Sequence, residues 1–187
     1  AEIRKLREHG VIRNHKLHLN DDFLKDRNGQ YNSWYHEMHS PGFNYRISDI
    51  HAALANSQLK KITQFSKKRS ALVSLYDEKI TPLKNIVPLK KLPFSQACWH
   101  LYVVLIDFDN IEPDRNDLMN RLREKNIGTQ VHYIPVHHQP YYKMLYQCDL
   151  PGADKFYKQC LSLPLYPDMN EQDVERVVKE LSDIVDM

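Results

Sequence analysis

Apolar residues recur at steps of three and four positions over residues 48–80, which predicts an amphipathic helix. Ser48 is a suitable N-cap and Asp49 complements the helix dipole in the first turn. Neither Gly nor Pro occurs before Pro82, so the pattern predicts a helix of about 33 residues and about 50 Å. Unless it kinks near Ser66, such a helix exceeds the diameter of its own domain, which favours a strut joining two bodies.

The following residues, 83–187, alternate predicted strands and helices. The apolar run 99–108 predicts a strand covered on both faces, and residues 129–134 predict a shorter one. Pro164 lies in a further extended segment and confines it to a sheet edge or an irregular strand. Together these segments predict a two-layer arrangement of sheet and helices.

The helices of this region begin and end at recognisable residues. Asp114 can cap a helix that stops by Gly128, and residues 153–160 predict a short helix. The final helix has the clearest signals, because Asn170 can cap it and apolar residues repeat along one of its faces.

The first 47 residues follow a different pattern. Residues 1–10 predict a helix that ends at Gly10, and the chain begins inside it, so we expect a piece of a longer protein. Residues 11–47 show little helical or strand periodicity, although VIR at 11–13 and NYRIS at 44–48 could each form a short extended piece. The segment contains aromatic side chains such as Trp34 and Phe43. This composition favours a binding loop that is ordered against another surface.

Composition excludes several classes of protein. Lys and Arg number 26 against 24 Asp and Glu, 42% of residues are hydrophobic, and the net charge is only +2. The basic run 60–69 is interpreted as a solvated helix face, so we expect neither nucleic-acid nor membrane binding. The odd set Cys98, Cys148 and Cys160 favours reduced, packed thiols and hence a cytoplasmic protein.

The five glycines are too dispersed for a phosphate-cradling loop, since no two lie closer than thirteen positions. Phosphate would have to be held by other groups. Asn44 and Arg46 alternate with Phe43 and Tyr45, so in an extended stretch the amide and guanidinium would point the same way. Such a pair suits phosphate or carboxylate, whereas the alternative is that Arg46 pairs with Asp49 or another carboxylate.

Residues 132–142 form a second candidate site. His132, Tyr133, His137 and Tyr141 could hydrogen-bond a hydroxyl-rich or nucleotide ligand. The alternative is that these histidines are satisfied at a strand end, with the tyrosines packed below.

Ten histidines also raise the question of a metal. They include the pairs His15 and His18, His36 and His39, and His137 and His138. No HExxH or Cys/His spacing pre-organises them, so we expect no metal site and rank a metal-dependent hydrolase as a third hypothesis.

Four ordered blocks resemble the DegT/DnrJ/StrS family of pyridoxal-phosphate-dependent sugar aminotransferases. The blocks are REHGVIR at 7–13, WYHEMHSPGFNYRISDIHAALANSQLKKI at 34–62, NIGTQVHYIPVHHQPYY at 126–142 and LSLPLYPDMNEQDVERVV at 161–178. Trp34, Tyr35 and Glu37 look most like the branch that aminates UDP-4-keto-6-deoxy-N-acetylhexosamines toward pseudaminic acid.

The resemblance implies the C-terminal part of a fold-type I transferase, an α/β protein whose α+β small domain has an antiparallel sheet covered by helices. Its parts would be the end of the large domain with the active-site loop (1–47), a long connecting helix (48–82) and the small domain (83–187). The family's Schiff-base lysine would lie outside the chain, and Lys16 does not match its motif. No catalytic residue is therefore expected here, and the chain alone would be inactive.

By the same resemblance, Asn44 contacts the pyridoxal phosphate and Arg46 contacts that phosphate or the donor carboxylate, both across a homodimer interface. The sugar nucleotide would be lined by His137 and, less directly, His132, Tyr133 and Tyr141. The implied activity is amino transfer from glutamate to a keto sugar nucleotide for polysaccharide or glycan synthesis. The alternative is a catalytically silent dimerisation or ligand-binding module of the same fold.

Overall fold

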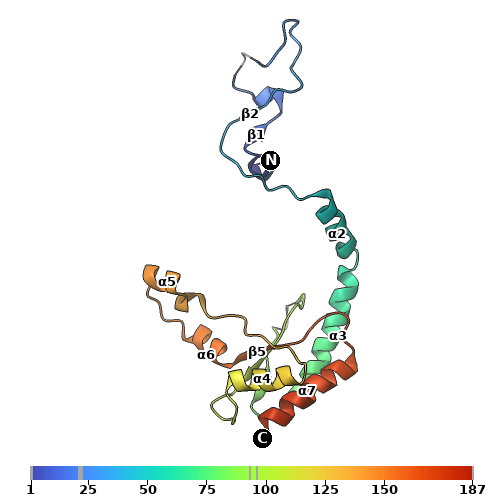
Figure 1. Ribbon diagram of the computed structural model, residues 1–187, viewed down its shortest axis with the longest axis vertical. Coiled ribbons are helices and arrows are strands. Elements are labelled where there is room, and N and C mark those ends of the chain that lie inside the picture. Colours follow the sequence, from blue (N-terminus) through green and yellow to red (C-terminus); the bar gives the residue numbers. More distant parts are fainter. Residues whose placement is uncertain (1, 21–22, 93, 96, 187) are drawn as a thin grey trace. The chain divides into compact units, whose positions relative to one another are not determined.

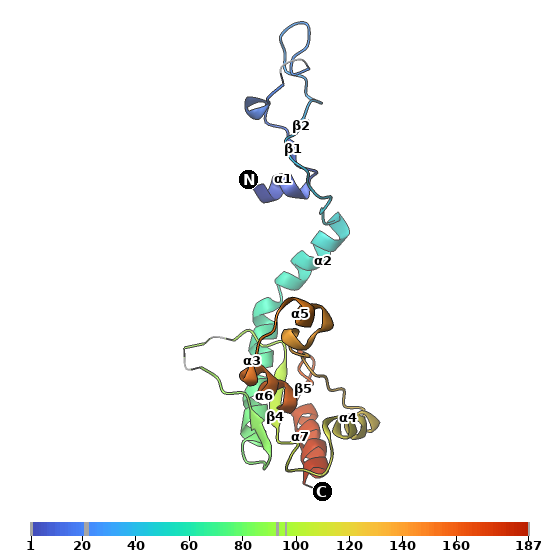
Figure 2. The same cartoon turned by 90° about the vertical axis from the view of Figure 1, so that its left-hand side faces the viewer.

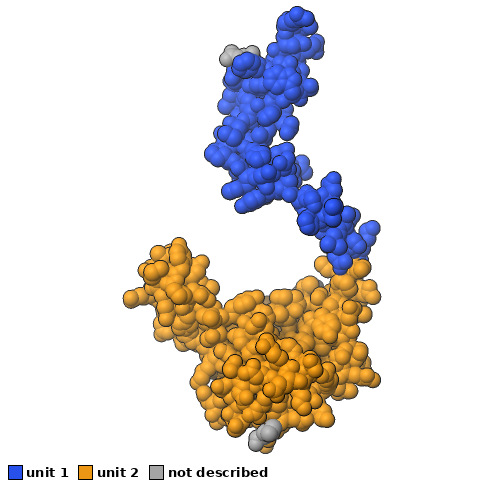
Figure 3. Space-filling view, viewed as in Figure 1, with its two compact units in different colours: residues 1–60 blue, residues 61–187 orange. Residues whose placement is uncertain are grey.

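The computed structural model describes residues 2–20, 23–92, 94–95 and 97–186. The chain divides into two compact units, residues 1–60 and residues 61–187, which are coloured separately in Figure 3.

The second unit is built on a three-stranded sheet in the order β3 (Ile86–Pro88), β4 (Tyr102–Ile106) and β5 (Cys160–Leu163). Both strand pairs are antiparallel, and Val104 at the centre of β4 lies opposite Pro88 and Leu161. The antiparallel sheet expected from the family resemblance is therefore confirmed. The position of β5 at the edge also agrees with Pro164, which follows it directly.

Three helices cover one face of this sheet: α3 (Ile62–Ile80), α4 (Arg115–Glu124) and α7 (Glu171–Val185). Figures 1 and 2 show α3 and α7 lying side by side, with α4 packed against α7. Because side chains alternate along a strand, one set of β4 residues meets these helices in a single core. The fully or nearly buried strand residues of that core are Ile86, Tyr102, Val104, Ile106, Leu161 and Leu163.

The expected helix caps are present. The Asp114 side chain accepts a 2.8 Å hydrogen bond from Asp117 N at the start of α4. At the start of α7, Asn170 Oδ1 accepts from Asp173 N at 3.1 Å, and Asp173 Oδ2 accepts from Asn170 N at 2.8 Å. This reciprocal capping box confirms Asn170 as the N-cap of the final helix and adds Asp173 to the cap.

The single helix predicted over 48–82 is wrong, because the structure has α2 (Asp49–Leu59) and then α3, separated by Lys60 and Lys61. Periodicity detects helical conformation but not a brief interruption of the hydrogen-bond ladder. Lys61 has ψ −7°, which breaks that ladder without Gly or Pro. The second helix continues into a packed core, whereas α2 has no buried residue.

Two strand predictions also need correction. The strand within 99–108 is shorter than predicted, and Val103 on its second face is only half-buried rather than covered. Residues 129–134 form no strand, since Gln130 makes an isolated bridge to Ser162 and the pairing goes no further. An apolar run shows that a segment extends, but its length in the sheet depends on which partner strand lies beside it.

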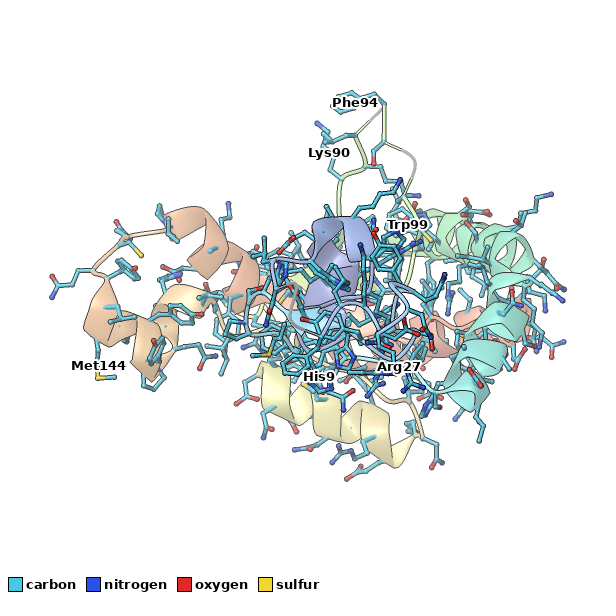
Figure 4. The ribbon with its side chains drawn as sticks, turned by 90° about the horizontal axis from the view of Figure 1, so that it is seen from above. His9, Arg27, Lys90, Phe94, Trp99 and Met144 are labelled. Atoms are coloured by element: carbon cyan, nitrogen blue, oxygen red, sulfur yellow. The ribbon has the colours of Figure 1, made fainter. Side chains whose placement is uncertain are left out.

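The remainder of this unit consists of η2 (Val136–His138), α5 (Pro140–Leu145) and α6 (Pro151–Gln159), of which α6 contacts β4. The short helix expected over 153–160 is thus confirmed, while η2 and α5 were not predicted. Figure 4 shows Phe94 far out on the loop that joins β3 to β4, and its side chain is 84% exposed.

The first unit contains α1 (Glu2–Arg7), η1 (His15–Leu17), α2 and a two-stranded antiparallel sheet of β1 (Val11–Ile12) and β2 (Glu37–Met38). Leu24 is its sole buried apolar side chain among those the structure describes. Large apolar side chains such as Trp34, Ile50 and Leu54 remain exposed.

The cysteines differ from expectation. Cys160 is buried, but Cys98 and Cys148 are exposed and therefore are not packing residues. Across the described ranges, no helix is both long and apolar enough to cross a membrane.

Candidate functional site

Asn44 and Arg46 project from the same side of the loop that precedes α2. Arg46 Nε donates a 2.9 Å hydrogen bond to Oδ1 of Asn44. The intervening ring of Tyr45 stacks instead on Phe43, with centroids 4.8 Å apart and planes 11° from parallel. The predicted alternation of an amide and guanidinium with two aromatic rings is therefore confirmed.

Backbone hydrogen bonds hold this loop against the first helix. Phe43 N donates to Leu6 O at 2.7 Å, and Tyr45 N donates to Arg7 O at 3.0 Å. Main-chain hydrogen bonds therefore hold the loop against α1. The orientation of the amide and guanidinium consequently does not depend on the packing of their own side chains.

Two glycines make this close approach possible. Gly10 has φ +74°, which glycine adopts without strain, and its N–H bonds to Lys5 O at 2.9 Å beyond the end of α1. A Cβ on Gly42 would lie 2.6 Å from the carbonyl carbon of His9, too close for any side chain. The helix end and the loop therefore meet backbone to backbone. Figure 4 labels His9 at this point of the first unit.

Glu8 is the carboxylate that faces the guanidinium. Its Oε1 lies 3.9 Å from Arg46 Nη1 and 3.6 Å from Arg13 Nη2. Within the described chain Arg46 makes no ion pair with Asp49, so that specific alternative is wrong, whereas pairing with another carboxylate occurs at long distance. The Arg46 side chain is 52% exposed, and an exposed pair of this length is weak.

The donor set of this loop fits an anion. With Nε engaged by Asn44, the two Nη groups of Arg46 remain partly exposed and can donate in parallel to phosphate or carboxylate oxygens. The Asn44 amide nitrogen adds a neutral donor beside them. These residues fit the phosphate of a pyridoxal cofactor, for which a planar guanidinium is well suited.

Glu37 organises the preceding loop, a role that sequence reasoning missed. Its carboxylate accepts from Leu19 N at 2.8 Å, Asn20 N at 2.9 Å and the Tyr35 hydroxyl at 3.0 Å, and pairs with His39 Nε2 at 2.6 Å. Burial opposes ionisation, but these hydrogen bonds outweigh it and lower the pKa of Glu37 to about 2. The WYHEMH motif therefore serves partly to hold residues 19–20 beside residues 35–39.

The second candidate group, which comprises His132, Tyr133, His137 and Tyr141, lies wholly in the second unit. Its two histidines contact different partners. His132 Nδ1 lies 2.8 Å from Ser162 Oγ on β5, and this pair is partly buried. Tyr133 and Tyr141 are 73% and 62% exposed, so most of the surface of each residue is open to solvent.

His137 belongs to a different cluster. Its Nε2 lies 2.9 Å from Oδ1 of Asp154, and His138 Nε2 lies 2.5 Å from the same oxygen. The hydrogen bond from His138 is the main cause that lowers the pKa of Asp154, with His137 adding to it against the opposing effect of desolvation. Both histidines line a cavity of about 340 Å³ together with Lys143, Tyr146, Gln147 and Cys148.

Sequence reasoning did not find Asp154 or Ser162 as partners of these histidines. Asp154 lies in the first turn of α6, where acidic residues are common for reasons of helix stability, so its position gave no separate signal. Ser162 alternates with core residues of β5 and is 5% exposed. Both contacts depend on segments that are distant in sequence.

Comparison with models of known protein families identifies the family of this sequence. The model of the DegT/DnrJ/EryC1/StrS aminotransferase family matches residues 1–182. The chain belongs to this family.

Among curated members, the spore coat polysaccharide biosynthesis protein SpsC of Bacillus subtilis (strain 168) is 36% identical over 157 residues, which cover 82% of the chain and 40% of SpsC. The UDP-4-amino-4-deoxy-L-arabinose–oxoglutarate aminotransferase of Shewanella sediminis (strain HAW-EB3) is 36% identical over 193 residues, with 99% and 47% covered. The chain thus spans less than half the length of these two relatives.

Solved structures of aminotransferases share the fold. Helicobacter pylori PseC, an aminotransferase involved in the biosynthesis of pseudaminic acid, has a TM-score of 0.81 at 24% identity, over 98% of this chain and 45% of PseC. The PLP form of the sugar aminotransferase Spr1654 from Streptococcus pneumoniae has a TM-score of 0.79 at 22% identity, over 98% and 42%. The fold is consistent with the C-terminal part of a fold-type I PLP enzyme, as expected.

Proposed function

We propose that this DegT-family chain forms the C-terminal part of a PLP-dependent enzyme that transfers an amino group from glutamate to a keto sugar nucleotide. The observation that carries this proposal is the parallel projection of Asn44 and Arg46 from an ordered loop, within a chain that belongs to an aminotransferase family. The names of the two curated relatives support amino transfer on a nucleotide sugar and a role in polysaccharide synthesis.

In this proposal Arg46 and Asn44 hold the phosphate of the cofactor, with Arg46 also available to the donor carboxylate. Their shared hydrogen bond fixes the guanidinium plane, so both Nη groups can donate without first ordering the side chain. When bound, the pyridoxal ring supplies an electron sink for amino transfer. Glu8 limits the excess positive charge beside the guanidinium when no anion is bound.

His137, His132, Tyr133 and Tyr141 face the sugar nucleotide in this proposal. The hydroxyls of the two exposed tyrosines, Tyr133 and Tyr141, would orient sugar or nucleotide oxygens by hydrogen bonding. His132 is held by Ser162, so its remaining ring nitrogen has a defined direction. A keto sugar nucleotide of the UDP-4-keto-6-deoxy-N-acetylhexosamine type is the substrate we infer from the WYHEMH block.

The active enzyme would be a homodimer in which the loop of Asn44 and Arg46 completes the partner's site. The exposed apolar side chains of the first unit support this arrangement, since they include Ile50 and Leu54 on α2 and Trp34 in the loop. A dimer partner or the remainder of the longer protein would cover them.

The lysine that anchors the cofactor would lie outside these 187 residues. Sodium borohydride reduction of the chain with added pyridoxal phosphate should then give no stoichiometric label on a single lysine. Peptide mass spectrometry after digestion measures this directly. Full labelling at one lysine, Lys16 for example, would contradict the proposed division of the enzyme.

The activity itself is tested on the protein at its natural full length. We expect glutamate-dependent amination of a UDP-4-keto-6-deoxy-N-acetylhexosamine, followed by mass spectrometry of the sugar nucleotide and by 2-oxoglutarate formation. Failure to aminate any of a panel of keto sugar nucleotides, by a protein that retains its cofactor, would favour the silent binding module instead.

A further inference from the structure

His137, His138 and Asp154 bring three ligand atoms together on one side of the second unit. The two imidazole nitrogens come from η2 and the carboxylate from the first turn of α6, 16 or 17 positions later. All three atoms lie within 4.8 Å of one another. Both Nε2 atoms point at the same carboxylate oxygen, and each becomes a metal ligand when its ring carries the proton on Nδ1, so that a bound ion takes the place of the two hydrogen bonds.

This donor set has a definite chemical preference. Calcium and magnesium favour sites made of oxygen ligands, whereas imidazole nitrogens favour zinc and its neighbours among the divalent transition metals. Zinc binds histidine nitrogen at about 2.0–2.1 Å and carboxylate oxygen at about 2.0–2.2 Å, so its ligand atoms lie roughly 3.3 Å apart in a tetrahedron. Small movements of the present side chains would reach that spacing.

The surroundings provide both rigidity and access. The His137 side chain is only 8% exposed, which restricts its ring, while His138 and Asp154 are each 39% exposed and open to solvent. The neighbouring cavity of about 340 Å³ leaves room for a water molecule as fourth ligand. Cys148 lines the cavity but is not among the three converging groups, and Lys143 contributes a positive charge that an ion must tolerate.

We propose that His137, His138 and Asp154 form a binding site for one divalent transition metal ion, with Zn²⁺ as the best fit. The site goes beyond the proposed aminotransferase function, although it shares His137 with the sugar-nucleotide side. It also revises the expectation of no metal, which considered histidine spacing alone and could not include Asp154.

The test measures metal binding with neither pyridoxal phosphate nor sugar present. Untagged protein is stripped with a chelator and then titrated with Zn²⁺ by calorimetry and with Co²⁺ by visible absorption. We expect one equivalent of each ion to bind, and Co²⁺ to give the intense bands of a four-coordinate site. An absence of saturable binding in the unaltered protein would overturn the site and would leave the aminotransferase proposal untouched.

Variants assign the binding to these residues. His138→Ala and Asp154→Asn should each weaken Zn²⁺ binding by roughly tenfold or more, because each removes a ligand. His100→Ala is the matched control, since His100 is also exposed and lies outside the cluster. Circular dichroism must show that each variant remains folded. Equal loss in the control and the cluster variants, or no loss in either cluster variant, would contradict the assignment.

Discussion

The hydroxyl of Tyr102 on β4 donates a 2.8 Å hydrogen bond to Oδ1 of Asp77 on α3. Tyr102 is 3% exposed and its ring stacks on Tyr76, with centroids 4.5 Å apart. Burial is the main cause that raises the pKa of Tyr102 above its ordinary value, and the hydrogen bond to Asp77 adds to it. The sheet and the helix are thus joined by a polar contact at the border of the apolar core, where Asp77 is 27% exposed and also pairs with Lys91.

Replacing Tyr102 by Phe should lower the free energy of unfolding by about 1 kcal/mol, because the partly buried carboxylate of Asp77 loses a hydrogen-bond donor. A raised pKa in the folded state means that the stabilisation is complete below pH of about 10 and declines as the pH rises above it. Between pH 8 and pH 10.5, the free energy of unfolding in urea should therefore decline less for Tyr102→Phe than for the unaltered protein. The control is Tyr146→Phe, since Tyr146 is 67% exposed. An equal decline in the free energy of unfolding for Tyr102→Phe and the unaltered protein would refute this prediction.

Gly42→Ala should disrupt the packing of the loop on α1, because the added Cβ would overlap the backbone of Gly10 and lie 2.6 Å from the carbonyl carbon of His9. We expect faster hydrogen exchange over residues 40–46 and, in the full-length enzyme, weaker retention of pyridoxal phosphate. Gly152→Ala is the control, since a Cβ there meets nothing within 4 Å and should stabilise α6 by roughly 0.5–1 kcal/mol. Similar exchange in both variants would contradict the interpretation.

Acid should loosen the loop that Glu37 organises. With its pKa lowered to about 2 in the folded state, Glu37 stabilises the fold above its ordinary pKa of 4.5 and loses that effect as the pH falls toward 2. The fluorescence of Trp34, measured in a Trp99→Phe background, should change over that range. Glu37→Gln should show the altered Trp34 fluorescence already at pH 7. The control, Glu124→Gln on α4, should not show it. An unchanged signal in Glu37→Gln would refute the role of this carboxylate.

Arg46→Ala should weaken cofactor retention in the full-length enzyme by roughly tenfold to a hundredfold, the effect of removing a hydrogen bond to a charged group. Arg46→Lys should recover only part of it, since an ammonium cannot donate two parallel hydrogen bonds. Arg27→Ala removes an exposed arginine of the same unit and serves as the control. Absorbance of the bound cofactor after dialysis measures all three. Equal retention by Arg46→Ala and Arg27→Ala would exclude a phosphate contact.

Asn170→Ala should destabilise the second unit by about 1 kcal/mol, the usual cost of removing an N-cap. The capping box with Asp173 is broken, and α7 supplies much of the core. Asn170→Asp preserves the acceptor and should recover most of the loss in urea unfolding. No recovery would indicate that another feature of Asn170 matters more than its side-chain oxygen.

Local signals explain which parts of the fold could be predicted. Asn170, Asp114 and Ser48 each cap a helix within three residues of themselves, so their roles depend on contacts that adjacent sequence defines. The shared orientation of Asn44 and Arg46 follows from the alternation of an extended backbone. The interruption at Lys60 and Lys61 could not be predicted in this way, because no helix-breaking residue marks it.

The candidate sites show the same difference between local and long-range contacts. Sequence alone determined the family resemblance, the antiparallel small domain that it implies and the alternation that pairs an amide with a guanidinium. Only the tertiary structure decided that Glu8 faces Arg46, that Ser162 holds His132 and that Asp154 joins His137 to His138. The physical reason is range: capping and strand alternation act over a few residues, whereas these partners meet only after distant segments have packed together.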